Sequence, residues 1–380
     1  MSETSRSNDD DNPSIAFVSS YGGSGGSEIY LGRLIPQLPH SSVRSIVSLG
    51  TGQFVEGLRG LGYGVLVIPT SGTPGSFVMS ARRLRRHLLA LRPDVIHANG
   101  LKAAIVSVLA SMATRLPVVW VRHDFSWEGR RARTLGHMCK RVVCVSRALA
   151  RTFPRSMARK IDVVYTGMPE VRIDRDEARK RVVGDLGEED ANPLISVIGR
   201  LVPGKGHLEL VEIAPRLLEE LPEAKVLFVG DMPPERLVDY VERLHRRIDE
   251  LRLDHVIFFL GHRDDALGVI AASDLIVIPS VSMHQGIETE GFPLLALEAM
   301  AVGTPVLANA VGGLPELLAE CGGLVPSGDR DALLRGILRV IKDHSAWERS
   351  AACGRHRART SFSEDEMVAK LQSVYLTAKR

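Results

Sequence analysis

The sequence has few residues that cross-link or stack, with four cysteines among 380 residues and only 5% aromatic side chains. Cys139, Cys144, Cys321 and Cys353 show no paired spacing, which favours reduced thiols in a reducing compartment over a disulfide framework. His137 lies near two of these cysteines, but the run RVVCVS has the pattern of a buried strand, which favours core thiols over zinc ligands. We therefore predict no metal site.

Long apolar runs are also absent. The most membrane-like stretch, residues 103–113, is too short to span a bilayer and is flanked by Lys102 and Arg115. Residues 1–13 have neither the basic start nor the apolar centre of a secretory signal, so we expect them to form a disordered tail. These absences favour a cytoplasmic protein.

The net charge is only +3, but it is unevenly distributed. Up to Glu170 there are 22 Lys and Arg against 11 Asp and Glu, and the rest of the chain has 26 against 34. A basic first half and an acidic second half indicate two domains with different partners, and part of the first partner is expected to be anionic. No nucleic-acid partner is predicted, because neither a binding motif nor interleaved aromatic residues accompany the basic charge.

Apolar runs of strand length recur ahead of amphipathic helical stretches. The runs are SIAFVSS, VRSIVSL, YGVLVIP, DVIHAN, PVVWVRH, RVVCVS and DVVYTG in the first half, and PLISVIG, AKVLFVG, HVIFFLG, DLIVIPS and TPVLAN in the second. Continuous hydrophobicity, without alternation, is typical of strands that are buried on both faces of a parallel sheet covered by helices. The length and these runs predict two doubly wound α/β domains.

A stretch rich in Gly, Asp and Glu, Val182 to Pro193, separates the two sets of strands and predicts the domain boundary. We predict a first domain over residues 14–185, a second over residues 186–361, and a C-terminal helix over residues 362–380 that returns to the first domain. Ligands of open α/β sheets bind beyond the carboxyl ends of the strands, so motifs in those loops carry the most weight.

Three motifs come close to known catalytic patterns. The turn YGGSGG has the shape of a hydrolase nucleophile elbow around Ser24, but it follows the first strand, so no earlier strand-to-helix loop exists to supply the second oxyanion donor. The stretch GRLVPGKGH is nearly a P-loop, but Gly206 stands where a magnesium-binding hydroxyl belongs. D-x-D triplets at Asp174 and Asp329 fall where helices begin, which favours helix caps over metal ligands.

The stretch ETEGFPLLALEAM is the most informative. Gly291 permits a sharp entry into a helix, Pro293 suits the first helical position, and LLALEAM propagates the helix. The amides of residues 292–294 are then expected to point outward unpaired, which makes an anion site. Glu290 stands just before the helix and Glu298 roughly 7 to 8 Å along its axis. This layout suits a nucleotide sugar whose diphosphate meets the amides while the carboxylates bind the sugar and the ribose.

The same stretch resembles the E-x(7)-E signature of the retaining GT-B glycosyltransferases, which transfer sugars from nucleotide donors without a metal. Further segments resemble that family in the family's order: GGSE (25–28), DVIHANGLKA (94–103), VRHD (121–124), VCVSRALA (143–150), GRLVPGKG (199–206), VGDMP (229–233) and FLGHRDD (259–265). The resemblance extends from about residue 14 to the terminal helix. It implies the GT-B fold, in which two doubly wound Rossmann-like parallel-sheet domains face each other across a cleft.

The resemblance also implies roles for single residues. The implied catalytic residues are His123, Glu290, Arg200 and Lys205, with Glu290 binding the sugar instead of acting as a nucleophile. The implied donor-binding residues are Gly25, Gly26, Arg200, Lys205, Arg263, Glu290, Gly291, Phe292, Pro293, Leu294 and Glu298. His97 and Asp124 are implied on the acceptor side, with a local structural role as the alternative for each. No cofactor and no metal are implied, since Arg200 and Lys205 would hold the donor diphosphate in place of magnesium.

The implied activity is the retaining transfer of a sugar, of hexosyltransferase type, from a nucleoside-diphosphate sugar to a hydroxyl of a saccharide, lipid-linked or small-molecule acceptor. Two alternatives stay open, a non-hydrolysing nucleotide-sugar epimerase and a catalytically silent sugar-nucleotide binding protein. The sequence departs from the family at Thr166, where Asn is usual, and in the loop Val281 to Thr289, which is longer than is common. The base, the sugar and the acceptor are not encoded in the spacing of these motifs.

The segment Met79 to Leu91 raises the question of a membrane surface. Three leucines share one face of the expected helix, and four arginines lie elsewhere on it: Leu84, Leu88 and Leu91, and Arg82, Arg83, Arg85 and Arg86. Two interpretations remain open. The segment is either a packed helix with a solvated basic face or an interfacial helix that holds the enzyme against anionic lipid at the inner face of the plasma membrane.

Overall fold

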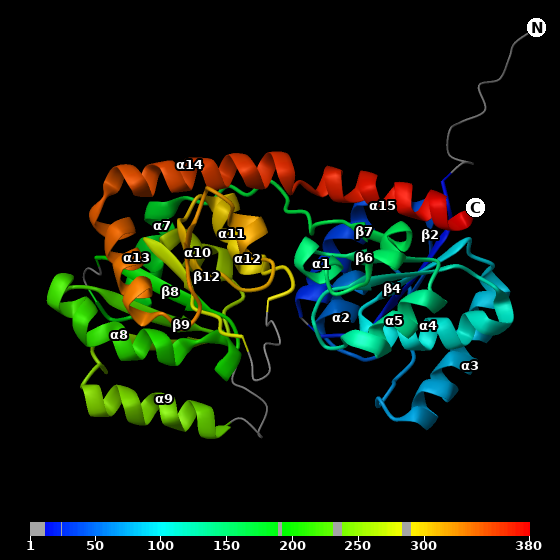
Figure 1. The fold of residues 1–380 in the computed structure, drawn as a ribbon, viewed down its shortest axis with the longest axis horizontal. Coiled ribbons are helices and arrows are strands. Elements are labelled where there is room, and N and C mark those ends of the chain that lie inside the picture. The colour runs from blue at the N-terminus through cyan, green and yellow to red at the C-terminus, as the bar shows by residue number, and fades with distance from the viewer. Residues whose placement is uncertain (1–11, 24, 189–191, 231–237, 283–289) are drawn as a thin grey trace, which may run out of the picture. The chain divides into compact units, whose positions relative to one another are not determined.

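The computed structural model describes residues 12–23, 25–188, 192–230, 238–282 and 290–380. It divides into two compact units, one formed by residues 1–167 together with residues 364–380, and the other by residues 168–363 (Figure 1). Residues 1–11 of the expected tail, Ser24 of the glycine turn and most of the loop Val281 to Thr289 lie outside the described residues.

The first unit is built on a seven-stranded parallel sheet with the strand order β3-β2-β1-β4-β5-β6-β7. The strands are β1 (Ile15–Ser19), β2 (Val43–Ser48), β3 (Val65–Val67), β4 (Val95–Asn99), β5 (Val118–Arg122), β6 (Arg141–Cys144) and β7 (Ile161–Val163). Six of them lie within apolar runs of the first half, and β7 begins one residue before the run DVVYTG. Every residue of β1, β4 and β5 is buried, as a parallel sheet covered by helices on both faces requires.

The helices of the first unit are α1 (Gly26–Leu34), α2 (Gln53–Gly60), α3 (Pro74–Leu91), α4 (Leu101–Thr114), α5 (Gly129–Met138), α6 (Arg147–Ala150) and α15 (Glu364–Lys379). The C-terminal helix α15 is part of this unit although it follows the second unit in the chain. The Tyr375 hydroxyl lies 2.6 Å from His97 Nδ1, and Lys379 Nζ lies 3.1 Å from an oxygen of Asp94. These contacts fix α15 to β4 and to the residue before it.

The second unit has a six-stranded parallel sheet with the order β10-β9-β8-β11-β12-β13. The strands are β8 (Leu194–Ile198), β9 (Lys225–Val229), β10 (Ile257–Gly261), β11 (Leu275–Ile278), β12 (Val306–Asn309) and β13 (Gly323–Val325). The first five match the apolar runs of the second half. The edge strand β13 was not predicted, because it is three residues long and begins with glycine.

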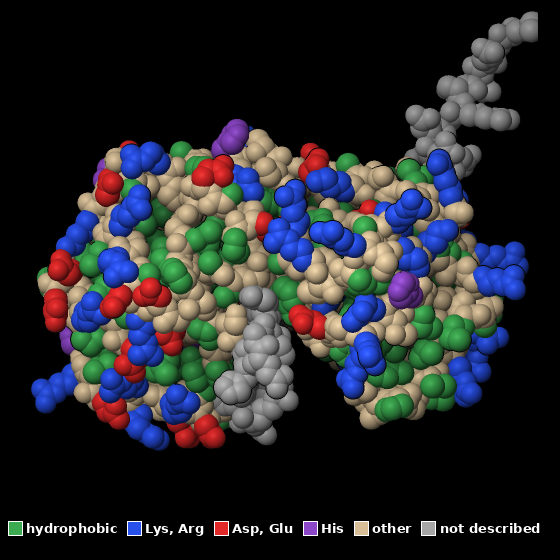
Figure 2. Space-filling model, viewed as in Figure 1, with side chains coloured by type: hydrophobic (Ala, Val, Ile, Leu, Met, Phe, Trp, Pro, Cys, Tyr) green, Lys and Arg blue, Asp and Glu red, His purple; other side chains and the backbone are tan. Residues whose placement is uncertain are grey.

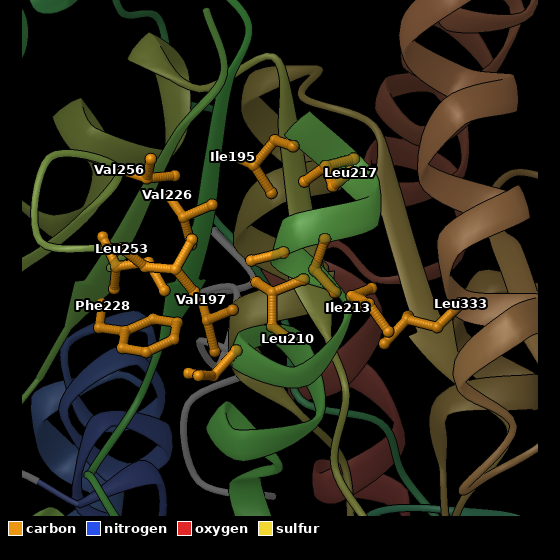
Figure 3. Packing of buried hydrophobic residues seen from close by; sticks show 14 of the residues in the cluster. Ile195, Val197, Leu210, Ile213, Leu217, Val226, Phe228, Leu253, Val256 and Leu333 are labelled. Atoms are coloured by element: carbon orange, nitrogen blue, oxygen red, sulfur yellow. The ribbon is translucent and has the colours of Figure 1, made fainter. Parts of the chain in front are cut away.

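The helices of the second unit are α7 (Arg175–Asp185), α8 (His207–Glu220), α9 (Val238–Leu251), α10 (Ala266–Ala272), α11 (Leu294–Val302), α12 (Leu314–Leu318), α13 (Arg330–Lys342) and α14 (His344–Ser361). Aliphatic side chains of α8 pack on β8 and β9, and Leu210, Val226 and Phe228 in this cluster are at most 1% exposed (Figure 3). Burying each such side chain stabilises the unit by about 1.5 to 3 kcal/mol.

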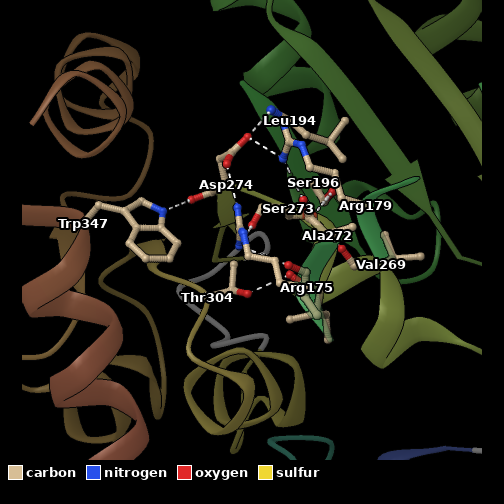
Figure 4. Close-up of polar contacts among 12 residues, drawn as sticks. Arg175, Arg179, Leu194, Ser196, Val269, Ala272, Ser273, Asp274, Thr304 and Trp347 are labelled. Atoms are coloured by element: carbon tan, nitrogen blue, oxygen red, sulfur yellow. Dashed lines mark hydrogen bonds and ion pairs between the residues drawn. The ribbon is translucent and has the colours of Figure 1, made fainter. Parts of the chain in front are cut away.

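Helix α7 belongs to the second unit, so the predicted boundary between residues 185 and 186 differs from the division that the structure shows, after Gly167. Asp274 accounts for the difference (Figure 4). Its carboxylate accepts hydrogen bonds from Arg175 at 2.6 Å and Arg179 at 2.9 Å, both on α7, and from the amide of Leu194 at 2.7 Å. The apolar face of α7 also packs on α10. The Gly-rich stretch that suggested a boundary is therefore a connection inside the second unit.

The prediction of four free thiols was wrong for one pair. Cys321 and Cys353 form a disulfide with a Cα–Cα distance of 5.1 Å, and it joins the turn before β13 to α14. Sequence spacing could not reveal this pair, because the two residues are 32 positions apart and the fold of the second unit brings them together. Cys139 and Cys144 are free and buried. No helix of the described residues is long and apolar enough to cross a membrane.

Candidate functional site

Polar side chains gather where the strand order of each sheet reverses, which is where doubly wound sheets bind their ligands. In the second unit the reversal lies between β8 and β11. The loop from β8 to α8 carries Lys205, Ser280 follows β11, and Glu290 precedes α11. In the first unit the reversal lies between β1 and β4, and Asn99 is the last residue of β4.

Glu290 is the centre of a buried polar cluster in the second unit. Its side chain is 5% exposed, and its Oε1 accepts hydrogen bonds from Lys205 Nζ at 2.7 Å and from Ser280 Oγ at 2.6 Å. The Ser280 carbonyl in turn accepts from Asn309 Nδ2 at 3.1 Å. A buried carboxylate needs such partners, because burial without them carries a large desolvation penalty. The cluster thus holds one fixed carboxylate beside one cation, and the lysine side chain remains 32% exposed.

Two glycines allow the backbone to close around this cluster. Gly206 has φ +72°, and a Cβ placed there would lie 1.9 Å from the carbonyl oxygen of Pro279. Gly312 has φ +53°, and its Cβ would lie 1.9 Å from the carbonyl oxygen of Glu290. Neither position accepts a side chain without moving backbone. Gly206, which replaces the hydroxyl residue of a P-loop, therefore lets the Lys205 loop pack directly on the end of β11.

The start of α11 differs in detail from the prediction. The helix begins at Leu294, and Pro293 is the N-cap residue, not the first helical residue. Proline has no amide hydrogen, so Pro293 cannot contribute an N–H to an anion site. Helix geometry leaves the amides of Leu294 and Leu295 without an intrahelical acceptor, while the amide of Ala296 donates to the Pro293 carbonyl at 3.1 Å. Gly291, Phe292 and Pro293 are buried, and Leu294 and Glu298 are partly exposed.

The two predicted arginines of the second unit are in different states. Arg200 is exposed, and within the described part of the chain its guanidinium has no partner. Arg263 is engaged with two carboxylates: it lies 2.7 Å from Asp265 and 2.6 Å from Asp185, and these bonds raise its pKa. Its side chain therefore ties the β10–α10 loop to the end of α7, and only its backbone remains for a ligand.

His123 follows β5 and is the main polar residue of the first unit's site. Its Nε2 lies 2.6 Å from Asn99 Oδ1, and the Tyr30 ring packs edge-on against it with centroids 4.9 Å apart. Burial lowers the pKa of His123 to about 4, although Asp124 acts in the opposite direction. The ring is therefore neutral near pH 7, and it can act as a hydrogen-bond partner without carrying charge.

Arg122 shapes the loop that His123 begins. The guanidinium is buried and donates to the carbonyls of Asp124 and Trp127 and to the Thr152 hydroxyl. Asp124 itself is exposed, and its carboxylate accepts the amide of Ser126 at 2.9 Å. These contacts favour the local, loop-ordering role of Asp124, which was the alternative to an acceptor-binding role.

The acceptor role suggested for His97 is contradicted by its burial. His97 is 0% exposed, hydrogen-bonded to Tyr375, and in contact with the rings of Phe17 and Tyr30. Burial lowers its pKa to about 3. A residue in the core of the sheet cannot line an acceptor pocket, so His97 is an anchor for α15.

Gly25 and Gly26 open helix α1 and are both exposed. Gly25 is the N-cap, and its carbonyl accepts the amides of Glu28 at 3.0 Å and Ile29 at 2.9 Å. Glu28 is buried, accepts from the hydroxyls of Ser19 and Ser27, and has its pKa raised by burial. This carboxylate fixes the first turn of α1 beneath the glycines.

Three further site residues were missed from sequence: Asn99, Ser280 and Asn309. Each lies at the carboxyl end of a strand, β4, β11 or β12, and that position was the signal available. Among the described residues, a group with metal-ligand geometry comprises Glu320, Cys321 and Cys353. Both sulfurs of that group are already bonded to each other, so neither is a thiolate ligand.

Two parallel-sheet Rossmann-like units, each with its polar residues at the reversal of strand order, define the GT-B class of fold. Solved structures share it. Over 95% of this chain and 99% of the other, the structure is similar to the crystal structure of Anabaena HepE in complex with UDP and glucose, with a TM-score of 0.83 and 24% identity.

Two family profiles match the sequence. Residues 24–172 match Glycosyltransferase Family 4, and residues 178–358 match Glycosyl transferases group 1. The chain therefore belongs to the group 1 glycosyltransferases of the GT-B fold.

Curated relatives carry related names. The chain is 29% identical over 215 residues to a GDP-mannose-dependent monoacylated alpha-(1-6)-phosphatidylinositol monomannoside mannosyltransferase of Corynebacterium glutamicum. It is 32% identical over 226 residues to a D-inositol 3-phosphate glycosyltransferase of Mycobacterium marinum. These matches span 56% and 58% of this chain, and 53% and 45% of the relatives, so the chain spans about half the length of each.

Proposed function

We propose that the protein transfers a sugar, with retention of configuration and without a metal, from a nucleoside-diphosphate sugar to a hydroxyl acceptor. The observation that carries the proposal is the Lys205–Glu290–Ser280 cluster at the start of α11. It offers a cation and helix amides for a diphosphate, and a buried carboxylate for the hydroxyls of the sugar. The alternatives are a non-hydrolysing nucleotide-sugar epimerase and a silent binding protein, and the products formed from the donor distinguish them.

The donor diphosphate would accept hydrogen bonds from Lys205, from Arg200 and from the amides of Leu294 and Leu295. Each charge-assisted bond contributes about 1.5 to 3 kcal/mol. Arg200 and Lys205 would then neutralise the charge that grows on the departing phosphate, a task that magnesium performs in P-loop enzymes. UDP in HepE and GDP-mannose in the name of the Corynebacterium relative leave both bases open for this chain.

The proposed reaction balances without a further reactant. The bond between the anomeric carbon and the β-phosphate oxygen breaks, and its electron pair stays on the phosphate. The acceptor oxygen forms the new bond on the same face of the sugar, and its proton passes to the leaving phosphate. His123 would hydrogen-bond a sugar hydroxyl, and Glu290 would hold another, so that the sugar is oriented while the bond breaks.

For the acceptor, a lipid-linked substrate at an anionic membrane surface is one option, and the structure changes which residues would meet the lipid. Leu84 and Leu88 of α3 are 0% exposed and so cannot enter a bilayer. The exposed apolar side chains of this helix are instead Val78, Met79 and Leu89. They lie among the exposed arginines 82, 83, 85 and 86, and Figure 2 shows hydrophobic and basic side chains next to one another over α3.

Donor hydrolysis and transfer by the Arg200→Ala variant test the proposed site. We expect kcat/KM for the donor to fall about 10-fold or more, because one charge-assisted bond to the diphosphate is lost. Arg246→Ala, an exposed arginine on α9, is the matched control. An unchanged kcat/KM in the Arg200→Ala variant would contradict the proposed donor site. Release of an epimerised donor without acceptor would favour the epimerase, and donor binding without turnover the silent protein.

Three measurements test the identity of the nucleotide base, the independence from metal and the membrane surface. Thermal shift with UDP, GDP, ADP and dTDP sugars identifies the base, and activity that survives EDTA supports a metal-free reaction. Sedimentation with vesicles of anionic lipid tests the surface of α3. Binding should weaken as salt rises and on changing the four arginines of α3 to Gln. Equal binding to neutral and to anionic vesicles would contradict an attachment that depends on the arginines of α3.

A further inference from the structure

The side-chain amide of Asn99 connects two parts of the first unit's site. Its Nδ2 donates to the carbonyl oxygen of Ser27 at 2.8 Å, and its Oδ1 lies 2.6 Å from Nε2 of His123. Ser27 is in the first turn of α1, directly after Gly25 and Gly26. One amide therefore joins the glycine turn to the histidine ring.

This connection determines where the proton of the histidine lies. A carbonyl only accepts hydrogen bonds, so the NH₂ group of Asn99 must face Ser27, and Oδ1 must face His123. Oδ1 is also only an acceptor, so Nε2 of His123 must carry the hydrogen. In the neutral ring Nδ1 then has a free lone pair, and among the residues that the structure describes none hydrogen-bonds to it.

The backbone of Asn99 is held as firmly as its side chain. Its carbonyl accepts the Ser20 amide at 3.1 Å and the Ser20 hydroxyl at 2.7 Å, and it ends the fully buried strand β4. Asn99 itself is 0% exposed. The amide therefore has one orientation available to it, and the ring of His123 is set by a rigid strand.

We propose that Asn99 is a positioning residue that holds His123 as the neutral Nε2–H tautomer, aligns it with the glycine turn, and leaves Nδ1 as an acceptor for a hydroxyl of the donor sugar. The tautomer follows from the contacts alone, whereas the role in transfer rests on the proposed function. The charged and titratable groups around the ring are Tyr30 on α1, His97 on β4 and Asp124 next in the chain. His97 is held neutral by burial, and Asp124 favours the protonated ring.

Nitrogen NMR of the full chain labelled with ¹⁵N-histidine tests the tautomer without any activity measurement. The His123 signals are identified by their absence in His123→Gln. We expect Nε2 to be protonated and Nδ1 to be unprotonated at neutral pH, and the ring to titrate near pH 4. A wild-type spectrum with the hydrogen on Nδ1 would overturn the proposal.

Asn99→Asp and Asn99→Ala separate positioning from mere packing. In Asn99→Asp a carboxylate faces Nε2 and favours the protonated ring, so the ring should titrate at higher pH and the acidic limb of the pH–rate profile should move with it. In Asn99→Ala we expect kcat to fall about 10-fold to 100-fold, with the donor KM within about twofold. Asn192→Asp, an exposed position in the second unit, is the matched control for the change of charge.

The outcomes separate the two proposals. An Asn99→Ala protein that is folded by circular dichroism, keeps the wild-type tautomer and keeps its kcat would contradict the positioning role. If the Asp variant does not fold, Asn99→Ala and Asn99→Ser still test the positioning role through the tautomer and kcat, because neither presents an amide oxygen to Nε2. If the wild-type chain shows no transfer with any donor, the proposed function fails, while the histidine spectra still decide how Asn99 acts on His123.

Discussion

Lys205 and Glu290 lie 85 positions apart in the sequence, and their charged atoms are 2.7 Å apart in the second unit. The carboxylate is 5% exposed and the lysine 32% exposed, so the pair is buried on one side and open on the other. Before a donor binds, each residue neutralises the other. A diphosphate would compete for the lysine, and a sugar hydroxyl would then take a place beside the carboxylate.

Changing Lys205 to Met should therefore affect stability and donor binding together. Among the residues that the structure describes, the buried Glu290 carboxylate would keep only Ser280 as a hydrogen-bond donor, so the free energy of unfolding should fall by about 1 to 3 kcal/mol. Donor affinity should fall by a similar energy, because the diphosphate loses a charge-assisted bond. Urea unfolding and calorimetric titration with the donor measure the two effects.

Glu290→Gln completes a double-mutant cycle with Lys205→Met. The glutamine still accepts from Ser280, so we expect the double variant to be more stable than the sum of the two single changes predicts. Additive losses would mean that the two residues do not interact in solution.

Alanine variants of Gly206 and Gly187 form a matched pair that measures the free-energy cost of close backbone contact. Their φ angles are +72° and +71°, but a Cβ at Gly206 would lie 1.9 Å from the Pro279 carbonyl, whereas nothing lies within 4 Å of one at Gly187. Gly187→Ala should cost about 1 kcal/mol, the strain of a left-handed alanine. Gly206→Ala should cost several times more in urea unfolding and should weaken donor binding, because the Lys205 loop must move away from β11. Equal costs would show that the loop is loosely packed.

Most of the fold was predictable because parallel strands have a strong local signature. Continuous apolar runs marked all seven strands of the first unit and five of the six in the second. The exception, β13, has only three residues and a glycine at its start, so its strand state depends on pairing with β12. The domain boundary was misplaced for a related reason. The assignment of α7 depends on the distant Asp274, and local composition around residues 182–193 carries no trace of that contact.

The site was predictable only where a motif stands in one continuous stretch. Lys205 and Glu290 belong to such stretches, and the structure brings them into contact. Ser280 and Asn99 act through single side chains at strand ends, and a lone Ser or Asn there looks like any capping residue. Of the two roles left open for His97, the structure favours the structural one, because the residue is buried within β4. The first residue of α11 was predicted to within one position, because Pro293 is the N-cap residue and the helix begins at Leu294. This is the usual precision for a helix start.

His207 offers a test of pH dependence. It is 0% exposed, and within the described residues neither ring nitrogen has a hydrogen-bond partner. Burial, helped by Lys205, lowers its pKa from 6.5 to about 4. The unfolded chain therefore takes up this proton first, and the free energy of unfolding falls as the pH drops below 6.5.

His207→Met should remove that loss. Relative to wild type, we expect the variant to gain about 1.4 kcal/mol for each pH unit between 6.5 and 4, measured by urea unfolding across that range. At pH 8 the change should be small and stabilising, because two unsatisfied nitrogens are replaced by an apolar side chain. His356→Met, at an exposed position on α14, controls for the substitution itself. Parallel pH profiles of His207→Met and wild type would show that His207 stays accessible to protons in the folded protein.

The disulfide between Cys321 and Cys353 can be tested by counting the reactive thiols of the chain. Burial raises the pKa of both Cys139 and Cys144 to about 12, so these thiols should not react in the native protein. We therefore expect a thiol reagent to detect no thiol in the folded chain, two thiols after denaturation and four thiols after denaturation with reduction.

The disulfide closes a segment of 32 residues, so Cys353→Ser should lower the free energy of unfolding by about 3 to 4 kcal/mol. Because α14 packs through Gly354 against Met300 of α11, the loss should be greatest in the unit that carries Glu290. Four thiols after denaturation alone, with unchanged stability of Cys353→Ser, would show that the two cysteines lie side by side without a bond.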